Sequence, residues 1–237
     1  MNKILLLGSQ HGNELLGEHL YAYIIAHRPD LLPVITFKKG NLKAYRQKVR
    51  YIESDLNRSY TGGHKTYEER RAGMILKYIK AQKFDLVLDL HTTTCDQPPC
   101  LIVAGITHGN RCFIRASSTE KIVHMNHKIV ETSLIGVYPK SVSIEVNETQ
   151  LGPELMEQLV GDIDRFVRNI SYDKPQTVYE ISGLIGKDEI TTKQAEKLRN
   201  FEMSPFGFYP VLVGENSYKK YTQYLGFKAY KTYQSKV

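Results

Sequence analysis

The sequence predicts an α/β protein built on a mostly parallel or mixed sheet with helices on both faces. Short apolar runs typical of buried strands alternate with amphipathic segments of helix length as far as residue 170. After residue 171 the apolar runs are short and separated by glycines, a pattern typical of a small β-rich unit. We therefore expect a larger domain over residues 1–170 and a small β-rich C-terminal domain over residues 171–237.

The composition is that of a folded protein. The 237 residues suffice for a full core, and fractions of 41% hydrophobic and 24% charged residues are ordinary for a globular chain. No apolar run is long enough to span a membrane, and the run after Met1 is too short for a signal peptide. The odd number of cysteines, three, indicates free thiols in a reducing compartment. We therefore expect a cytoplasmic protein without a membrane partner.

A net charge of +7 predicts a surface that attracts anions. Three explanations stay open: a solvated basic surface, an acidic small substrate, or nucleic acid. Lysines and tyrosines of the C-terminal tail resemble a nucleic-acid surface in composition; they are Lys219, Lys220, Lys228, Lys231 and Lys236 with Tyr221, Tyr224, Tyr230 and Tyr233. Because both residue types also cover exposed strands, nucleic-acid binding is the disfavoured interpretation.

The first elements predict the opening of an α/β unit. Residues 4–7 are apolar at every position and end at Gly8, as expected for a strand buried on both faces. Apolar residues then recur at helical spacing over residues 15–27, with Asn13 as the expected N-cap. A second strand is expected over residues 34–37.

The stretch over residues 42–64 has no periodicity, although it is rich in arginine, aspartate and asparagine. Long irregular stretches inside compact domains are usually functional or disordered. A helix is expected over residues 67–81, followed by a strand over 84–90 that ends at His91. The remaining expected elements are strands over residues 101–104, 142–146, 178–181, 210–213 and 227–230 and helices over residues 120–132 and 153–170.

Three residues favour a metal site at one edge of the sheet. His11 and Glu14 follow the first strand directly, and His91 ends another. Ligands of parallel sheets lie beyond the carboxyl ends of the strands, and a His, Glu, His set with an open fourth position is typical of hydrolytic zinc sites. Taken alone, His-x-x-Glu is more often a capped helix start. We predict one zinc ion because His91 is expected at the same sheet edge as His11 and Glu14. We assign no role to Asp89.

A hydrolytic zinc site also needs a carboxylate that transfers protons. Glu145 is our candidate, because it interrupts an apolar strand where an unpaired charge is costly. The alternative is a glutamate on an edge strand that faces solvent. Arg50, Asn57 and Arg58 lie in the aperiodic stretch and suit a substrate carboxylate or a developing oxyanion.

Four blocks in this order resemble the succinylglutamate desuccinylase and aspartoacylase family, which consists of zinc amidohydrolases with a carboxypeptidase-like α/β domain. They are His-Gly-Asn-Glu at 11–14, Arg-Tyr-Ile-Glu-Ser-Asp-Leu-Asn-Arg at 50–58, Asp-Leu-His-Thr-Thr-Thr at 89–94 and Ser-Ile-Glu-Val at 143–146. The second and third blocks look more like the aspartoacylase branch. Pro-Val-Leu-Val-Gly-Glu-Asn-Ser-Tyr at 210–218 also looks like the aspartoacylase C-terminal segment.

The resemblance implies a role for each matching residue. Zinc would be bound by His11, Glu14 and His91. Glu145 would be the general base and then the general acid, and Arg50 would stabilise the oxyanion. The α-carboxylate of the amino-acid part would be held by Asn57 and Arg58, with Tyr218 in contact with the substrate.

The implied partner is a small anionic N-acyl amino acid, with acyl-aspartate as the first choice. Succinylglutamate and a peptide C-terminus are alternatives with the same chemistry, and a non-catalytic nucleic-acid-binding module is the alternative from another class. The oligomeric state stays open, a homo-oligomer included.

One departure concerns the side chain of the substrate. Aspartoacylases carry an arginine shortly before the catalytic glutamate that grips the side-chain carboxylate of aspartate, but no arginine lies between Arg115 and Glu145. Lys140 is the nearest cation and Tyr138 the nearest aromatic residue. Neither residue is in register with the family pattern, and a lysine is a point charge, so we do not expect strict selection for acyl-aspartate. If Lys140 substitutes for the arginine, its loss should raise KM for acyl-aspartate far more than for a neutral acyl amino acid.

Overall fold

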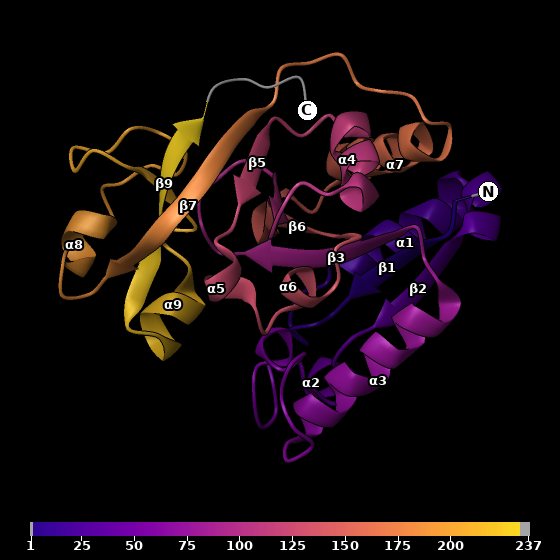
Figure 1. The fold of residues 1–237 in the computed structure, drawn as a ribbon, viewed down its shortest axis with the longest axis horizontal. Helices are drawn as coiled ribbons and strands as arrows, with labels where there is room; N and C mark the ends of the chain where they lie inside the picture. Colours follow the sequence, from indigo (N-terminus) through magenta and orange to yellow (C-terminus); the bar gives the residue numbers. More distant parts are fainter. Residues whose placement is uncertain (1, 233–237) are drawn as a thin grey trace.

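Nine strands form one continuous sheet in the computed structural model, which describes residues 2–232 (Figure 1). Their spatial order is β2, β1, β3, β6, β4, β5, β7, β9 and β8. The bounds are Ile4–Gly8 (β1), Ile35–Lys39 (β2), Leu86–Thr93 (β3), Cys100–Val103 (β4), Lys121–His124 (β5), Ser141–Asn147 (β6), Thr177–Gly186 (β7), Tyr209–Val211 (β8) and Tyr224–Thr232 (β9). Tyr233 and Lys236 of the basic tail lie outside the described residues.

The α-helices among residues 2–232 are Leu16–His27 (α1), Leu42–Gln47 (α2), Tyr67–Gln82 (α3), His108–Ala116 (α4), His127–Val130 (α5), Leu134–Val137 (α6), Pro153–Val167 (α7), Thr192–Ala195 (α8) and Asn216–Tyr221 (α9). Short 3₁₀ helices cover Pro29–Val34, Leu56–Arg58 and Glu148–Gln150. No helix in the described part of the chain is both long and apolar enough to cross a membrane.

The sheet is mixed, with a parallel N-terminal part. β1 pairs in parallel with β2 and β3, and β3 pairs in parallel with β6. β4 runs antiparallel to β6, and β5 and β7 then follow β4 in parallel. β9 is antiparallel to both β7 and β8. The predicted fold class is confirmed, and the C-terminal ends of β1, β3 and β6 lie at one edge because these strands run in one direction.

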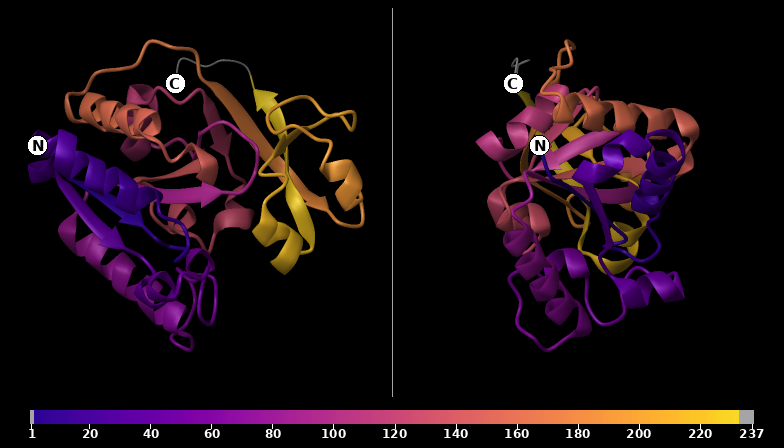
Figure 2. Two further views of the ribbon diagram at one scale, coloured as in Figure 1. Left: turned by 180° about the vertical axis from the view of Figure 1, so that it is seen from behind. Right: turned by 90° about the vertical axis from the view of Figure 1, so that its right-hand side faces the viewer.

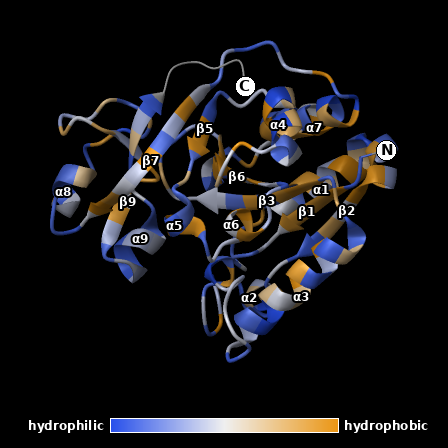
Figure 3. Cartoon of the chain, in the orientation of Figure 1, coloured by the Kyte–Doolittle hydropathy of each residue, from blue (hydrophilic) through white to orange (hydrophobic). Residues whose placement is uncertain are grey.

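Helices cover both faces of the sheet. α1, α4 and α7 pack on one face, and α3 and α6 pack on the other (Figures 1 and 2). β1 shows why its run must be apolar throughout, since Ile4 and Leu6 face the first layer while Leu5 and Leu7 face the second. Figure 3 shows this strand in the orange of hydrophobic residues, and it lies between β2 and β3 in the sheet. Full burial of each such side chain contributes roughly 1.5–3 kcal/mol.

The C-terminal β-rich segment continues the same sheet. β7 pairs with β5, and apolar side chains of β7, β8 and β9 share a cluster with those of β4 and β5. A smaller cluster lies within the C-terminal segment and includes Ile185, Phe208, Val213 and Leu225. The β-rich character is therefore as expected, and the division into two domains at residue 170 stays a prediction.

The helix predicted over residues 120–132 is wrong. The segment forms β5 and the short helix α5. Ile122 and Val123 are fully buried in β5, which has β4 and β7 as its neighbours. β-branched side chains favour such a strand, and the spacing of a short apolar run does not distinguish a buried strand from a buried helix.

Local polar contacts change two further boundaries. Residue 15, rather than Asn13, precedes α1, because the chain turns tightly before it and Glu14 N donates to His11 O at 3.0 Å. α2 lies inside the stretch that has no apolar periodicity. It begins where the Asn41 side chain accepts a hydrogen bond from Ala44 N at 3.1 Å.

Candidate active site

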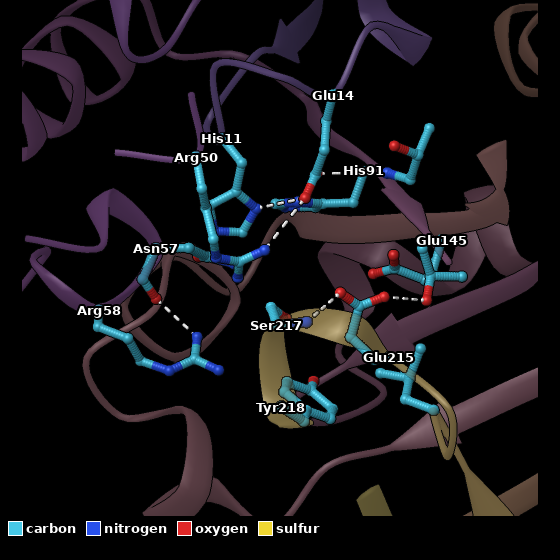
Figure 4. Close-up of a pocket in the computed structure, with 13 residues that line it drawn as sticks. His11, Glu14, Arg50, Asn57, Arg58, His91, Glu145, Glu215, Ser217 and Tyr218 are labelled. Carbon is cyan, nitrogen blue, oxygen red and sulfur yellow. Dashed lines mark hydrogen bonds and ion pairs between the residues drawn. The ribbon is translucent and has the colours of Figure 1, made fainter. Parts of the chain in front are cut away.

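One pocket is lined by all eight predicted site residues (Figure 4). It opens at the C-terminal ends of β1, β3 and β6. The predicted residues in its lining are His11, Glu14, Arg50, Asn57, Arg58, His91, Glu145 and Tyr218. The lining also includes Thr92, Thr93, Leu212, Glu215 and Ser217, which lie in the family-like blocks at 89–94 and 210–218 but received no individual role from the sequence.

His11, Glu14 and His91 converge as a metal site requires. One potential ligand atom from each lies within 4.8 Å of the others. Nδ1 of His11 is 2.7 Å from Glu14 Oε1, and Nδ1 of His91 is 2.9 Å from Glu14 Oε2. All three side chains are buried. Two imidazole nitrogens and one carboxylate fit the three protein ligands of a catalytic zinc site.

Carboxylates also face the far nitrogens of both histidines. His11 Nε2 is 3.0 Å from Asp55 Oδ1, and His91 Nε2 is 3.0 Å from Asp89 Oδ2, although the latter pair lacks hydrogen-bond geometry. Burial lowers the pKa of His91, but Asp89 and Glu14 outweigh it and raise that pKa well above its usual value. Such pairs orient metal-binding imidazoles and increase their basicity. Asp89 shares the face of His91 because residues two apart on a strand point the same way.

Close packing joins the metal-binding turn to the aperiodic stretch. Gly12 N donates to Arg50 O at 3.1 Å. A Cβ at Gly12 would lie 2.1 Å from the backbone carbon of Ala44, so only glycine permits this approach. Arg50 is half-buried between Glu14, at 3.4 Å, and Asp55, at 3.2 Å. The metal ligands and the proposed oxyanion residue are therefore held by one set of contacts.

Glu68 on α3 shapes the loop that carries the substrate-binding candidates. Its fully buried carboxylate accepts backbone hydrogen bonds from residues 52, 53 and 54 at 2.8, 3.2 and 3.2 Å, and one from Asn41 Nδ2 at 3.0 Å. Burial alone would raise the pKa of Glu68, but these donors lower it, so the group stays ionised. This role could not be predicted, because a glutamate in the first turn of a helix is ordinary.

Glu145 lies beside the metal ligands on a central strand. β6 lies between β3 and β4, so the alternative of an edge-strand glutamate is wrong. Glu145 pairs in register with His91 and lines the pocket. Burial raises the pKa of Glu145 to about 8 in the metal-free protein. A carboxyl group with a pKa near neutrality can both accept and donate a proton.

The C-terminal segment closes one side of the pocket. Glu215 accepts hydrogen bonds from Thr93 Oγ1 at 2.7 Å and from Thr94 N at 2.8 Å, next to His91 on the chain. It also caps α9 through Ser217 N at 3.0 Å, which brings Tyr218 to the pocket (Figure 4). Glu215 lies in the family-like segment at 210–218, but its role could not be predicted because its partners are at sequence separations of 121 and 122.

Lys140 does not line the pocket, so it does not take the place of the family arginine. Lys140 directly precedes β6, whereas the pocket lies at the other end of that strand. Five residues of extended chain, roughly 16 Å, separate it from Glu145. Its ammonium lies 3.9 Å from Asp85 Oδ1, and the Tyr138 hydroxyl donates to Phe84 O at 3.2 Å.

Residues 1–146 match the succinylglutamate desuccinylase/aspartoacylase catalytic domain. A probable aspartoacylase of Trichodesmium erythraeum is 34% identical over 170 residues, which are 64% of this chain and 58% of that protein. An N-acyl-aromatic-L-amino acid amidohydrolase (carboxylate-forming) of Rattus norvegicus is 33% identical over 119 residues, covering 42% of this chain and 36% of that protein. The chain thus spans less than two thirds of the length of these relatives.

Solved structures share the fold. Murine aminoacylase 3 superposes with a TM-score of 0.72 at 20% identity, covering 98% of this chain and 95% of that one. The succinylglutamate desuccinylase from Chromobacterium violaceum gives a TM-score of 0.75 at 16% identity, covering 98% and 85%. These structures show the shared fold. The match over residues 1–146 places the chain in the succinylglutamate desuccinylase/aspartoacylase family, and the sequence relatives favour the aspartoacylase branch.

Proposed function

We propose that the protein is a zinc-dependent hydrolase that cleaves the amide bond of N-acyl amino acids and releases a carboxylate and an amino acid. The convergence of His11, Glu14 and His91 within 4.8 Å, in a pocket that also contains Glu145 and Arg50, carries this proposal. The names of the sequence relatives, aspartoacylase and N-acyl-aromatic-L-amino acid amidohydrolase, support it.

The side chains of the pocket divide the chemistry between them. When bound by the three ligands, zinc supplies Lewis-acid activation of water and of the amide carbonyl. Glu145 accepts a proton from water as the oxygen adds to the carbonyl carbon, and Arg50 stabilises the negative charge that develops on the carbonyl oxygen. Glu145 then delivers the proton to the amide nitrogen as the carbon–nitrogen bond breaks.

The charges of the pocket bear on the substrate class. Apart from the two histidines assigned to the metal, the cationic side chains among the described residues that line it are Arg50 and Arg58. With Arg50 placed at the oxyanion, Arg58 and the Asn57 amide remain for the α-carboxylate. The side-chain carboxylate of acyl-aspartate then has no cationic partner, and a buried unpaired charge is costly. We therefore propose that acyl amino acids with one carboxylate are cleaved more efficiently than acyl-aspartate.

A substrate panel tests both levels of this proposal. The purified chain, loaded with zinc, is assayed on N-acetyl derivatives of phenylalanine, leucine and aspartate and on succinylglutamate. A higher kcat/KM for the phenylalanine and leucine derivatives, whose side chains are uncharged, than for the aspartate derivative supports the proposed class. A preference for acyl-aspartate would overturn only the argument from the charges of the pocket. Cleavage that persists unchanged after zinc is removed with a chelator would contradict the zinc mechanism.

A further inference from the structure

A chain of buried polar side chains lies behind His91, outside the pocket lining. Asp89, two residues before His91 on β3, is fully buried, as is Gln10. Asp89 Oδ1 accepts a hydrogen bond from Gln10 Nε2 at 2.5 Å. Asp89 Oδ2 accepts one from Ser143 Oγ at 2.9 Å and lies 3.0 Å from His91 Nε2. Both oxygens of this carboxylate are therefore occupied.

The orientation of the Gln10 amide follows from its neighbours. A carboxylate only accepts hydrogen bonds, so the amide nitrogen must face Asp89. The amide oxygen then faces away and accepts from the Tyr60 hydroxyl at 2.7 Å. Tyr60 packs in the apolar cluster between the sheet and α3, and its backbone N–H donates to Thr132 O at 3.0 Å. The packed core thus fixes the far end of the chain of contacts.

We infer that Gln10 and Tyr60 are positioning residues of the metal site, which hold the Asp89 carboxylate so that its Oδ2 faces His91 Nε2 and His91 Nδ1 faces the metal. This inference rests on the proposed function only in that the three ligands bind zinc. Gln10 also directly precedes the ligand His11 on the chain. One residue thus connects the two strands that supply the histidine ligands.

Buried hydrogen bonding explains why the loss of Gln10 would matter. Without its amide, Asp89 Oδ1 would be an unpaired oxygen in a water-free environment, which is costly. The carboxylate would then rotate toward its remaining donor, Ser143. This rotation weakens its hold on the imidazole of His91. Partners of metal-binding histidines typically affect metal affinity by about 10–100-fold.

The test measures zinc affinity by competition with a chromophoric chelator, using the full chain and three variants. Gln10→Met removes the amide and keeps the length of the side chain. Tyr60→Phe removes only a hydroxyl and leaves Gln10 in place. Tyr138→Phe is the matched control, because its hydroxyl also makes one hydrogen bond but lies at the opposite end of β6. Melting temperatures of the zinc-free proteins are recorded in parallel.

We expect Gln10→Met to raise the Kd for zinc by about 10-fold, the lower end of the range for direct partners of metal-binding histidines. Tyr60→Phe should raise it by a smaller factor, and Tyr138→Phe should leave it unchanged. Comparable melting temperatures of the two tyrosine variants would show that the effect on zinc is not a general loss of stability. Equal zinc affinity of Tyr60→Phe, Tyr138→Phe and the unmodified chain would overturn the inference, even where Gln10→Met fails to fold. The zinc Kd values do not depend on turnover. If the substrate assays show that the zinc-loaded chain cleaves nothing, the proposed function is overturned and this inference still stands.

Discussion

The two halves of the pocket are built in different ways. His11, Glu14, His91 and Glu145 follow or belong to strands of the central sheet, and the three metal ligands are buried. Asn57 and Arg58 instead belong to the short 3₁₀ helix Leu56–Arg58 between α2 and α3, where Asn57 is half-buried and Arg58 is exposed. The sheet itself fixes the metal half. The substrate half depends on a few long-range hydrogen bonds.

In the substrate half, hydrogen bonds to two buried or half-buried carboxylates hold the backbone in place. Glu68 gathers the backbone N–H groups of residues 52–54, and Glu215 joins α9 to the end of β3. Glu68 supports one segment of the substrate half and Glu215 supports another. We therefore expect substitutions in the substrate half to weaken substrate binding without loss of the metal. A substitution of the proton-transfer residue should stop catalysis while the metal and the substrate still bind.

The largest effect is expected for Glu145→Gln. An amide cannot take the proton from water, so kcat should fall by about 10²–10⁴-fold. Zinc content should stay at that of the unmodified chain, because Glu145 is not among the three ligands. Glu148→Gln, an exposed glutamate three residues later, is the matched control and should retain activity. Equal kcat for Glu145→Gln and its control would remove Glu145 from the mechanism.

Glu68→Gln should separate the two halves of the pocket. Loss of the carboxylate leaves some of the loop N–H groups poorly paired, at a cost of about 1–3 kcal/mol in the free energy of unfolding. We expect KM to rise, by about tenfold for each 1.4 kcal/mol of lost substrate binding, while zinc affinity changes much less. Glu157→Gln on the exposed face of α7 serves as the control. Loss of zinc with an unchanged KM would show that the loop supports the metal half instead.

Zinc binding should weaken as the pH falls. The pKa of His91 is raised well above its usual value by Asp89 and Glu14, which outweigh its burial, so zinc must displace a proton from this side chain. The stability of the zinc-free protein should change in the opposite sense. A raised folded-state pKa contributes stability that is complete below the unfolded pKa of about 6.5 and is lost as the pH rises through the folded value. Zinc titrations at several pH values, with proton release measured in two buffers, test whether zinc binding weakens as the pH falls. A Kd for zinc that is independent of pH would contradict it.

The smallest effect is expected for Lys140→Ala. Because this side chain is exposed and lies at the far end of β6, kcat/KM should be unchanged for acyl-aspartate and for neutral acyl amino acids alike. A selective loss with acyl-aspartate would restore Lys140 as a determinant of specificity. That outcome would require a contact with the substrate that the fold does not provide.

The metal half of the pocket could be predicted from the sequence, and most of what supports it could not. Apolar periodicity places β1 and β3, and parallel strands share an edge, so His11 and His91 could be brought together without coordinates. Glu68, Glu215 and Gln10 carry no such pattern. Their partners are distant in sequence, as with Gln10 and Asp89 at a separation of 79 residues. Only the folded chain shows that these ordinary polar residues face each other.

The family resemblance supplied the roles of Arg50, Asn57 and Arg58, since an irregular loop gives no periodic signal. The resemblance identified no residue in place of the missing arginine. Lys140 is near Glu145 along the chain, but the two residues lie toward opposite ends of β6. The prediction of a helix over residues 120–132 was wrong for a related reason. Burial of Ile122 and Val123 between two strands is a property of the whole sheet and not of the segment.

A zinc titration of the metal-stripped chain tests the proposed site most directly. Bound zinc and hydrolysis of the N-acetyl amino acid panel are followed together as metal is added. We predict that activity is absent at the start, rises in proportion to bound zinc and levels off at one ion per chain, as expected for a single site built from His11, Glu14 and His91. Equal hydrolysis by the stripped and the reloaded chain, or a fully loaded chain that cleaves none of the panel, would contradict a zinc amidohydrolase.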